Sequence, residues 1–284
     1  MKNFIKRILL FVLGVPALIA ILLFVDQFNH LAFSIIVLVF CIIGSVEFAA
    51  LLGGKNMPLY KAEAAILGAI APLSAILYVS FDLQPVFIAS AFCIGASWVL
   101  VSRVFSPTDK LDLFLNRAAA GLAVLIYPGL LTSWIIALFA FNRSEVILLT
   151  FLLIVFLNDG AAWGAGILFG KKNRGIIPAS PKKSIAGYAG GLIFSAGIGI
   201  LAVKFFPDAF PSDILPWYIA GGILGLGAGL AGCLGDLAES CLKRSAGVKD
   251  SGKAIPGRGG ILDSIDSISL AAPLYYLIFR LLFT

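Results

Sequence analysis

Apolar runs long enough to cross a membrane recur along this chain of 284 residues, which is 60% hydrophobic and 13% charged. A soluble domain is about half apolar and about a quarter charged. Since the bilayer core offers no hydrogen-bonding partners, a run of roughly 20 apolar residues predicts an α-helix. We therefore expect an all-α polytopic membrane protein with about nine transmembrane helices, at about 5–25, 31–52, 62–80, 85–102, 118–140, 145–169, 185–206, 216–242 and 265–283.

The basic residues indicate how the chain is oriented. If the N-terminus is cytoplasmic, the cytoplasmic loops hold 18 of the 21 Lys and Arg residues, and the opposite side holds only Arg143 and Lys204. This is the bias that the positive-inside rule describes. We therefore expect a cytoplasmic N-terminus in an inner membrane of bacterial type. Basic loops also suit anionic lipid headgroups, although the first three loops are sufficiently explained as topology signals.

The polar residues divide the chain into two regions. Residues 1–144 are predicted to be N-terminal transmembrane helices with few polar side chains. Residues 145–284 are predicted to form a C-terminal catalytic transmembrane region with cytoplasmic loops 170–186 and 243–264. In the first region, Glu47 lies near the cytoplasmic end of its span, and we interpret it as the partner of a nearby lysine.

The stretch 240–266 holds five cations, three carboxylates and five glycines in a chain with few charges. Glycine lets the backbone come close to a ligand and direct its N–H groups at oxyanions. Asp263 and Asp266 are expected to open the last helix, three residues apart on one face. For Asp263, beside a Gly-Gly turn, we favour a metal role, whereas Asp266 fits either a site role or a helix cap.

A second cluster lies at the end of the preceding span. Asp236, Glu239, Ser240 and Lys243 fall on one helical face, at i, i+3, i+4 and i+7. Carboxylates at this depth are expensive and indicate function by default. For Glu239 an ion pair with Lys243 at i,i+4 is an acceptable alternative, but not for Asp236, which lies deeper.

Two further elements complete the predicted site. Asp159 precedes Lys171 by 12 residues, which places it about 18 Å inside its span at the helical rise; a buried structural role remains an alternative. Residues 180–187 form a basic, hydroxyl-bearing loop that runs into a helix start. Phosphate binding there is favoured by the helix dipole, the exposed N–H groups and the lysines.

The one histidine, His30, falls on the predicted outer side. A Ser-His-Asp or histidine–metal mechanism is therefore not expected on the cytoplasmic side. The carboxylates, lysines and arginines that remain suit phosphoryl or nucleotidyl transfer with Mg²⁺.

These segments together resemble the phosphatidate cytidylyltransferase (CDP-diacylglycerol synthase) family. Its signature, Ser-x-apolar-Lys-Arg-x4-Lys-Asp-x-Gly-x2-apolar-Pro-x-His-Gly-Gly-apolar-x-Asp-Arg-apolar-Asp, is matched at most positions between residues 240 and 266. The upstream Gly-Asp-x-x-Glu-Ser matches residues 235–240, and residues 180–187 are similar to the family's Ser-Pro-Lys-Lys-Thr-x-Glu-Gly loop. The buried aspartate of the family's sixth span corresponds to Asp159, and the nine-helix layout extends the resemblance over the whole chain.

The resemblance implies a Mg²⁺-dependent nucleotidyltransferase of phospholipid biosynthesis that converts CTP and phosphatidate to CDP-diacylglycerol and pyrophosphate. It implies that Asp236 and Asp263 hold the metal. The residues expected to carry catalysis are Asp159, Asp236, Lys243, Arg244, Lys249, Asp250, Asp263 and Asp266. Those expected to bind substrate are Ser180, Lys182, Lys183, Ser184, Ser240, Arg258, Gly259 and Gly260. Membrane lipids are the expected surroundings, a homodimer follows from the resemblance only, and we expect no nucleic-acid partner.

Three positions depart from the family pattern. Arg258 stands where the family has His, Ser264 where it has Arg, and Ala186 where it has Glu. Our hypothesis is that Arg258 reaches the phosphate that the family arginine holds, so that Ser264→Arg alone should change activity little. The alternatives to phosphatidate cytidylyltransferase are a related transferase acting on another lipid phosphate or lipid alcohol, an inactive or scaffold paralogue, and an anion or lipid carrier.

Overall fold

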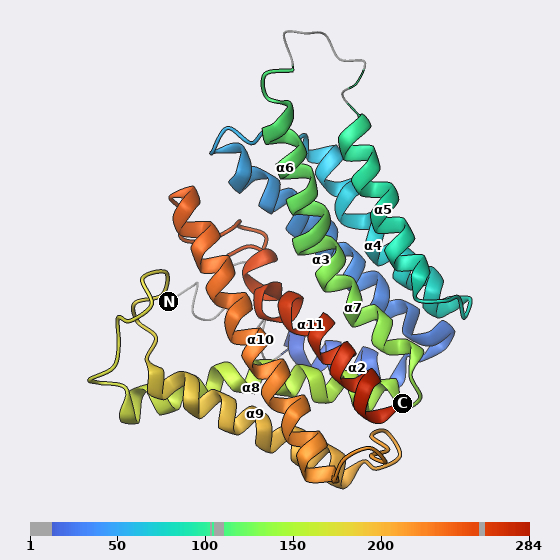
Figure 1. Cartoon of the computed structure of the whole chain (residues 1–284), viewed down its shortest axis with the longest axis vertical. Helices are drawn as coiled ribbons and strands as arrows, with labels where there is room; N and C mark the ends of the chain where they lie inside the picture. Colours follow the sequence, from blue (N-terminus) through green and yellow to red (C-terminus); the bar gives the residue numbers. More distant parts are fainter. Residues whose placement is uncertain (1–12, 103, 105–110, 256–258) are drawn as a thin grey trace. The chain divides into compact units, whose positions relative to one another are not determined.

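The computed structural model describes residues 13–102, 104, 111–255 and 259–284 (Figure 1). In these residues all regular structure is helical, apart from two isolated β-bridges. Two short apolar helices, α2 (Val15–Phe24) and α5 (Val86–Val101), accompany seven helical stretches long and apolar enough to cross a membrane. The seven are α3 (Gln27–Gly53), α4 (Lys61–Ser80), the stretch Phe114–Ala140, α8 (Ser144–Phe169), α9 (Ile185–Phe205), α10 (Trp217–Ala246) and α11 (Leu262–Phe283). The chain is therefore an all-α polytopic membrane protein, as expected.

The chain forms two compact units. The first contains Met1–Ala140 and Ser245–Ile265, and the second contains Phe141–Arg244 and Asp266–Thr284. The segment between α10 and α11 thus belongs with the N-terminal helices, whereas most of both helices belongs with α8 and α9. Each unit is described by itself below.

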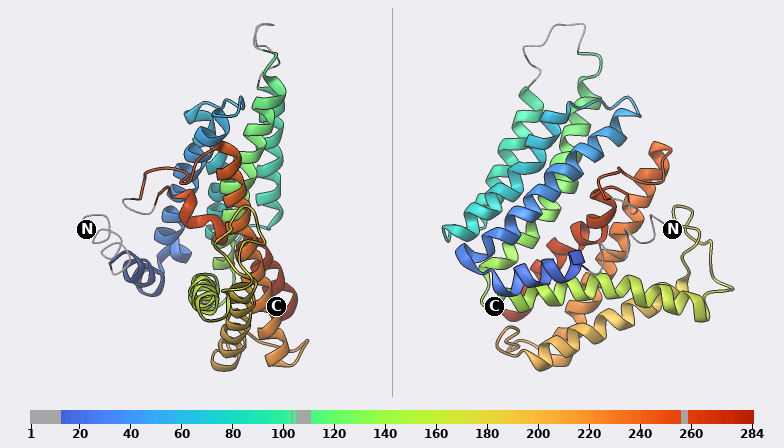
Figure 2. Two further views of the ribbon diagram at one scale, coloured as in Figure 1. Left: turned by 90° about the vertical axis from the view of Figure 1, so that its left-hand side faces the viewer. Right: turned by 180° about the vertical axis from the view of Figure 1, so that it is seen from behind.

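In the first unit α3, α4, α6 (Phe114–Val124) and α7 (Thr132–Ala137) pack against one another (Figures 1 and 2). Small residues make this packing close: a Cβ on Gly68 of α4 would overlap the side chain of Ser45 on α3. Such small residues let helix backbones approach in a membrane, where association depends on packing rather than on the hydrophobic effect.

The helix between α6 and α7 widens into a π-helical segment, η3 (Leu125–Leu131), which contains Pro128. Proline has no N–H and its ring clashes with the preceding turn, so it removes one i→i−4 bond from an α-helix. A π-bulge absorbs such a defect without ending the helix. The span then continues through α7 and the 3₁₀ turn η4 (Leu138–Ala140).

In the second unit α8 and α9 lie side by side (Figures 1 and 2). A buried polar node joins three helices: Asn158 of α8 donates through Nδ2 to Ser195 Oγ of α9 at 2.9 Å, and Cys233 Sγ of α10 donates to Asn158 Oδ1 at 3.3 Å. Tyr275 of α11 donates its hydroxyl to the carbonyl of Ile147 on α8 at 2.9 Å. These bonds fix the scaffold around the cavity described next.

Candidate active site

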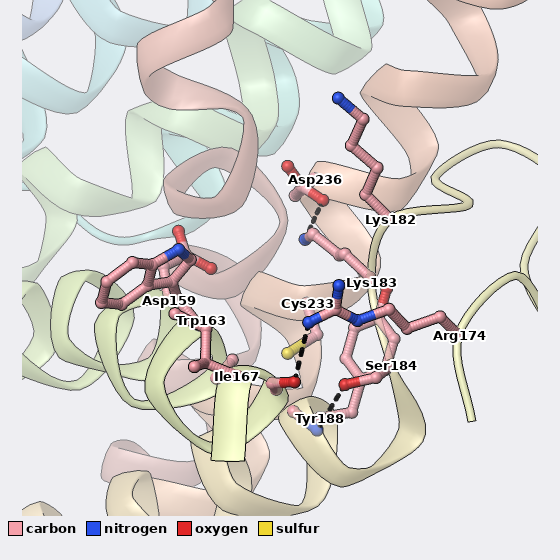
Figure 3. Close-up of a pocket in the computed structure, with 13 residues that line it drawn as sticks. Asp159, Trp163, Ile167, Arg174, Lys182, Lys183, Ser184, Tyr188, Cys233 and Asp236 are labelled. Atoms are coloured by element: carbon pink, nitrogen blue, oxygen red, sulfur yellow. Dashed lines mark hydrogen bonds and ion pairs between the residues drawn. The ribbon is translucent and has the colours of Figure 1, made fainter. Parts of the chain in front are cut away.

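A cavity of about 470 Å³ lies in the second unit (Figure 3). Its walls come from α8, from the loop that joins α8 to α9, from the first turn of α9, and from α10. Apolar and cationic groups share these walls, with two carboxylates. The lining residues are Asp159, Ala162, Trp163, Gly166, Ile167, Arg174, Lys182, Lys183, Ser184, Gly187, Tyr188, Cys233 and Asp236.

The central contact of this cavity is an ion pair between Lys183 of the loop and Asp236 of α10 (Figure 3). Both side chains are half-buried, and the lysine ammonium also lies 5.6 Å from the centre of the Tyr188 ring. Burial by itself lowers the pKa of Lys183, but the charge of Asp236, its hydrogen bond and the charge of Asp159 outweigh this, so that the pKa is raised. The lysine is therefore a fixed positive charge at neutral pH.

The loop between α8 and α9 is tied to both helices. Arg174 donates through Nη2 to the carbonyl of Gly166 on α8 at 2.9 Å. Ser184 is the N-cap of α9, and its hydroxyl accepts from the N–H of Gly187 at 3.1 Å. The helix start expected from the sequence is thus confirmed. These contacts hold Lys182 and Lys183 at the cavity wall.

Asp159 lines the cavity and its side chain is exposed, which speaks against the buried structural role that the sequence left as an alternative. The physical reason is the helical turn of about 100° per residue. Asn158 is 2% exposed and faces α9 and α10, which turns the next side chain toward the cavity. A site role for Asp159 stays a prediction.

A second ion pair lies on α10, C-terminal to Asp236. Glu239 is fully buried and pairs with Lys243, one turn further along the helix. This confirms the structural alternative that the sequence left open for Glu239. Ser240 and Arg244 lie on the same helix, and neither lines the cavity, nor does Ser180 of the loop. The predicted catalytic role of Arg244 and the predicted substrate-binding roles of Ser240 and Ser180 stay predictions.

Asp266 approaches the same part of α10 from α11. A Cβ on Gly235 would lie 2.5 Å from the carbonyl oxygen of Asp266, so the two helix backbones touch beside Asp236. The charges of Asp266 and Asp236 therefore interact. Asp266 Oδ1 accepts from the N–H of Ser267 at 2.6 Å.

The first unit holds the other part of the signature segment. Asp263 Oδ2 accepts three hydrogen bonds: from the N–H of Ser251 at 2.9 Å, from the Ser251 hydroxyl at 2.8 Å, and from the N–H of Gly260 at 2.7 Å. Gly259 has φ +127°, a conformation that L side chains rarely adopt. Ile255 and Gly259 pair through the N–H of Ile255 and the carbonyl of Gly259 at 2.8 Å. Asp263 therefore ties Ser251 to Gly260 within the described part of the loop.

Lys249, Asp250 and Lys253 are exposed on the same loop, and Asp250 packs its Cβ beside Gly259. Arg258 lies outside the described residues. Ser264, where the resemblance implies an arginine, has a buried hydroxyl oxygen with no hydrogen-bond partner among the described residues. The predicted roles of Lys249, Asp250 and Lys253 stay predictions.

Sequence reasoning missed Glu47 of α3. We interpreted it as the partner of a lysine near its end of the helix, but its Oε2 accepts from the N–H of Leu262 at 3.0 Å. These residues are 215 positions apart, and no local pattern signals such a pairing.

The donor chemistry of the site fits Mg²⁺. Among the described residues no three His, Cys, Asp or Glu side chains gather as a ready-made metal cage. Mg²⁺ commonly binds through one or two carboxylates and takes its other ligands from water and substrate phosphates. Asp236 in the second unit and Asp263 in the first are each carboxylates of that kind, and their predicted role as metal ligands stays a prediction.

The fold and these clusters define an integral membrane protein of α-helices, with a cavity whose cations and carboxylates suit phosphate-bearing substrates. The model of the cytidylyltransferase family matches residues 5–282, so the chain belongs to this family.

Several relatives bear the name phosphatidate cytidylyltransferase, among them the following three. The protein of Synechocystis sp. is 41% identical over 133 residues, which is 45% of this chain and 43% of that protein. The protein of Staphylococcus aureus is 36% identical over 189 residues, which is 66% of this chain and 65% of that protein. The protein of Mycobacterium bovis is 32% identical over 161 residues, which is 56% of this chain and 45% of that protein. The chain thus aligns with 43% to 65% of the length of these curated relatives.

Proposed function

We propose that this protein is a phosphatidate cytidylyltransferase. A phosphate oxygen of phosphatidate attacks the α-phosphorus of CTP, the bond from that phosphorus to the β-phosphate oxygen breaks, and CDP-diacylglycerol and pyrophosphate are formed. The family match and the names of the relatives support the reaction type. The observation that carries the proposal is the cavity in which Lys183 and Asp236 form an ion pair beside Lys182, Arg174 and Asp159.

The residues divide the work by their chemistry. Lys182 and Lys183 bind phosphate oxygens, which positions the reacting groups and neutralises charge that builds up on pyrophosphate. Trp163 and Ile167 give the cavity an apolar wall on α8, which suits a lipid substrate. Lys249 and Lys253 of the exposed loop supply further positive charge.

Asp236 and Asp263 are the residues that would hold Mg²⁺. When bound, the metal supplies electrostatic stabilisation of the phosphate oxygens. Asp236 is held by Lys183, and Asp263 by Ser251 and Gly260, so both carboxylates are oriented by the chain itself.

We also propose that the cavity opens toward the cytoplasm of a bacterial-type inner membrane, because the loops beside it are rich in lysine and arginine. A cysteine introduced at Lys172 tests this. It should react with a membrane-impermeant thiol reagent in inverted vesicles and not in right-side-out vesicles, and the reverse pattern would refute the orientation.

The activity test is conversion of radiolabelled CTP to a lipid-soluble product by purified protein in detergent, with phosphatidate and Mg²⁺. Asp263→Ala should abolish product, whereas Asp208→Ala, at an exposed aspartate far along the chain from these clusters, should retain it. Product from another nucleotide or lipid acceptor, and none from CTP with phosphatidate, would favour a related transferase. If no pair yields product, the departures at Ala186, Arg258 and Ser264 mark a loss of this activity.

A further inference from the structure

Glu47 joins the N-terminal helices to the signature loop. It lies six residues before the end of α3 at Gly53, and its Oε2 accepts from the N–H of Leu262, the first residue of α11, at 3.0 Å. The backbone amides of Ile261 and Ala254 also hydrogen-bond to its carboxylate. We call the residues just before positions 256–258 the first limb of the loop and those from Gly259 to Leu262 the second limb. The Glu47 carboxylate therefore receives N–H groups from both limbs.

Two glycines leave room for this carboxylate. A Cβ at Gly252 or at Gly260 would overlap its oxygen atoms. Gly252 belongs to the first limb of the loop and Gly260 to the second. The glycines of the signature thus have a specific steric partner here, and that partner lies in the N-terminal half of the chain.

The same two limbs hold Asp263. Ser251, next to Gly252, donates to Asp263 Oδ2 through its N–H and its hydroxyl, and Gly260 donates through its N–H. If the limbs separate, these three donors leave Asp263 together. We propose that Glu47 is a positioning residue, which fixes the two limbs of the loop and thereby the orientation of the Asp263 carboxylate. This inference rests on the proposed function for its catalytic consequence only.

The chemistry requires a carboxylate at this place. A charge-assisted bond to a backbone N–H is stronger than a neutral one, and the N-terminus of a helix favours negative charge. Glutamine has nearly the same size, but its NH₂ group would face N–H donors and leave some of them without an acceptor. A buried donor left without a partner costs about 1–3 kcal/mol.

The first readout needs no activity. Trypsin cleaves the peptide bond between Lys253 and Ala254. The N–H of this bond belongs to Ala254 and is hydrogen-bonded to the Glu47 carboxylate. Cleavage of a folded protein follows the population of its locally open form. We expect Glu47→Gln to raise the rate of cleavage at Lys253 about tenfold, as followed by mass spectrometry of protein in detergent. Glu63→Gln, at the first turn of α4, is the control and should cleave at the wild-type rate.

A second variant keeps the charge and changes only the fit. Gly252→Ala places a methyl group against the Glu47 carboxylate and should also speed cleavage at Lys253. Gly53→Ala is its matched control on α3, since a Cβ there meets nothing within 4 Å. This pair keeps the inference testable if Glu47→Gln does not fold.

The kinetic readout separates positioning from general stability. Glu47→Gln should raise the Mg²⁺ concentration needed for half-maximal product formation and lower kcat, with a melting temperature close to that of the wild type, and Glu47→Asp should restore part of the activity. The inference is overturned if Glu47→Gln and Gly252→Ala leave cleavage unchanged, or if cleavage rises while Mg²⁺ dependence and kcat stay at wild-type values. If the wild type makes no product, the proposed function fails, and the cleavage rates alone decide whether Glu47 holds the loop.

Discussion

Lys183 and Asp236, 53 residues apart in the chain, form an ion pair at the wall of the cavity in the second unit. The pair joins the loop before α9 to α10. Lys183, which is predicted to bind phosphate, therefore contacts Asp236, which is predicted to bind metal. Each group is thus oriented by the other before any substrate arrives, which is the preorganisation that electrostatic catalysis needs.

This pair predicts the reactivity of Lys183 toward an amine-acylating reagent. Only the neutral amine reacts, and the raised pKa of Lys183 keeps it protonated at pH 8. We expect Lys183 to be labelled several times more slowly than the exposed Lys182, as read by peptide mass spectrometry. In Asp236→Asn the burial that lowers the pKa remains without the opposing carboxylate, so labelling of Lys183 should speed up. Equal labelling before and after this change would show that the pair does not form in solution.

The second ion pair predicts a loss of stability. Glu239 and Lys243 have side chains that are 1% and 15% exposed, and removing one partner of a buried pair costs about 3–5 kcal/mol. Lys243→Met should therefore lower the melting temperature in detergent strongly, whereas Arg244→Met, at an exposed neighbour, should not. The double variant Glu239→Gln with Lys243→Met should recover much of the loss.

A low activity of Lys243→Met would by itself say little about catalysis. If the double variant is stable and still inactive, Lys243 acts in the reaction as predicted. If it is stable and active, Lys243 serves the structure, and its assignment as a catalytic residue is wrong.

The sequence predicted what depends on local pattern. Apolar runs predicted spans close to the helices of the described residues, although positions 5–12 of the first predicted span lie outside them. Ser184 is the N-cap of a helix as expected, and the i,i+4 spacing found the Glu239–Lys243 pair. These features follow from residues a few positions apart, where the 3.6-residue period determines which side chains meet.

The sequence did not predict contacts that depend on tertiary packing. The partner of Glu47 lies 215 residues away, and nearby lysines offered a plausible local alternative. The exposure of Asp159 depends on which face of α8 the neighbouring helices cover, and that face is set by Asn158 and its partners on α9 and α10. A mostly apolar span such as α8 carries little amphipathic signal to indicate that face.

The contact between α9 and α10 predicts a large effect of one methyl group. A Cβ on Gly225 would lie 2.7 Å from the carbonyl carbon of Ser195 and 2.9 Å from Ala196 Cα, which are backbone atoms that cannot turn away. Gly225→Ala should therefore lower the melting temperature by several degrees. Gly222→Ala is the matched control, since its Cβ would meet Ile200 at an ordinary 3.8 Å. Equal melting temperatures for the two variants would mean that these helices are not this close.

The buried node of Asn158 predicts a measurable coupling energy. Its Nδ2 donates to Ser195 Oγ at 2.9 Å, where both residues are almost fully buried. Double-mutant cycles of interhelical hydrogen bonds in one well-studied membrane protein gave about 0.6 kcal/mol on average and up to about 1.7 kcal/mol. A double-mutant cycle of Asn158→Ala and Ser195→Ala, measured by unfolding in detergent, should give a coupling in this range. Because the node lies behind the cavity wall, kcat should change less than stability does. A coupling near zero would mean that packing alone joins α8 to α9, whereas a much larger fall in kcat than in stability would place Asn158 in the reaction itself.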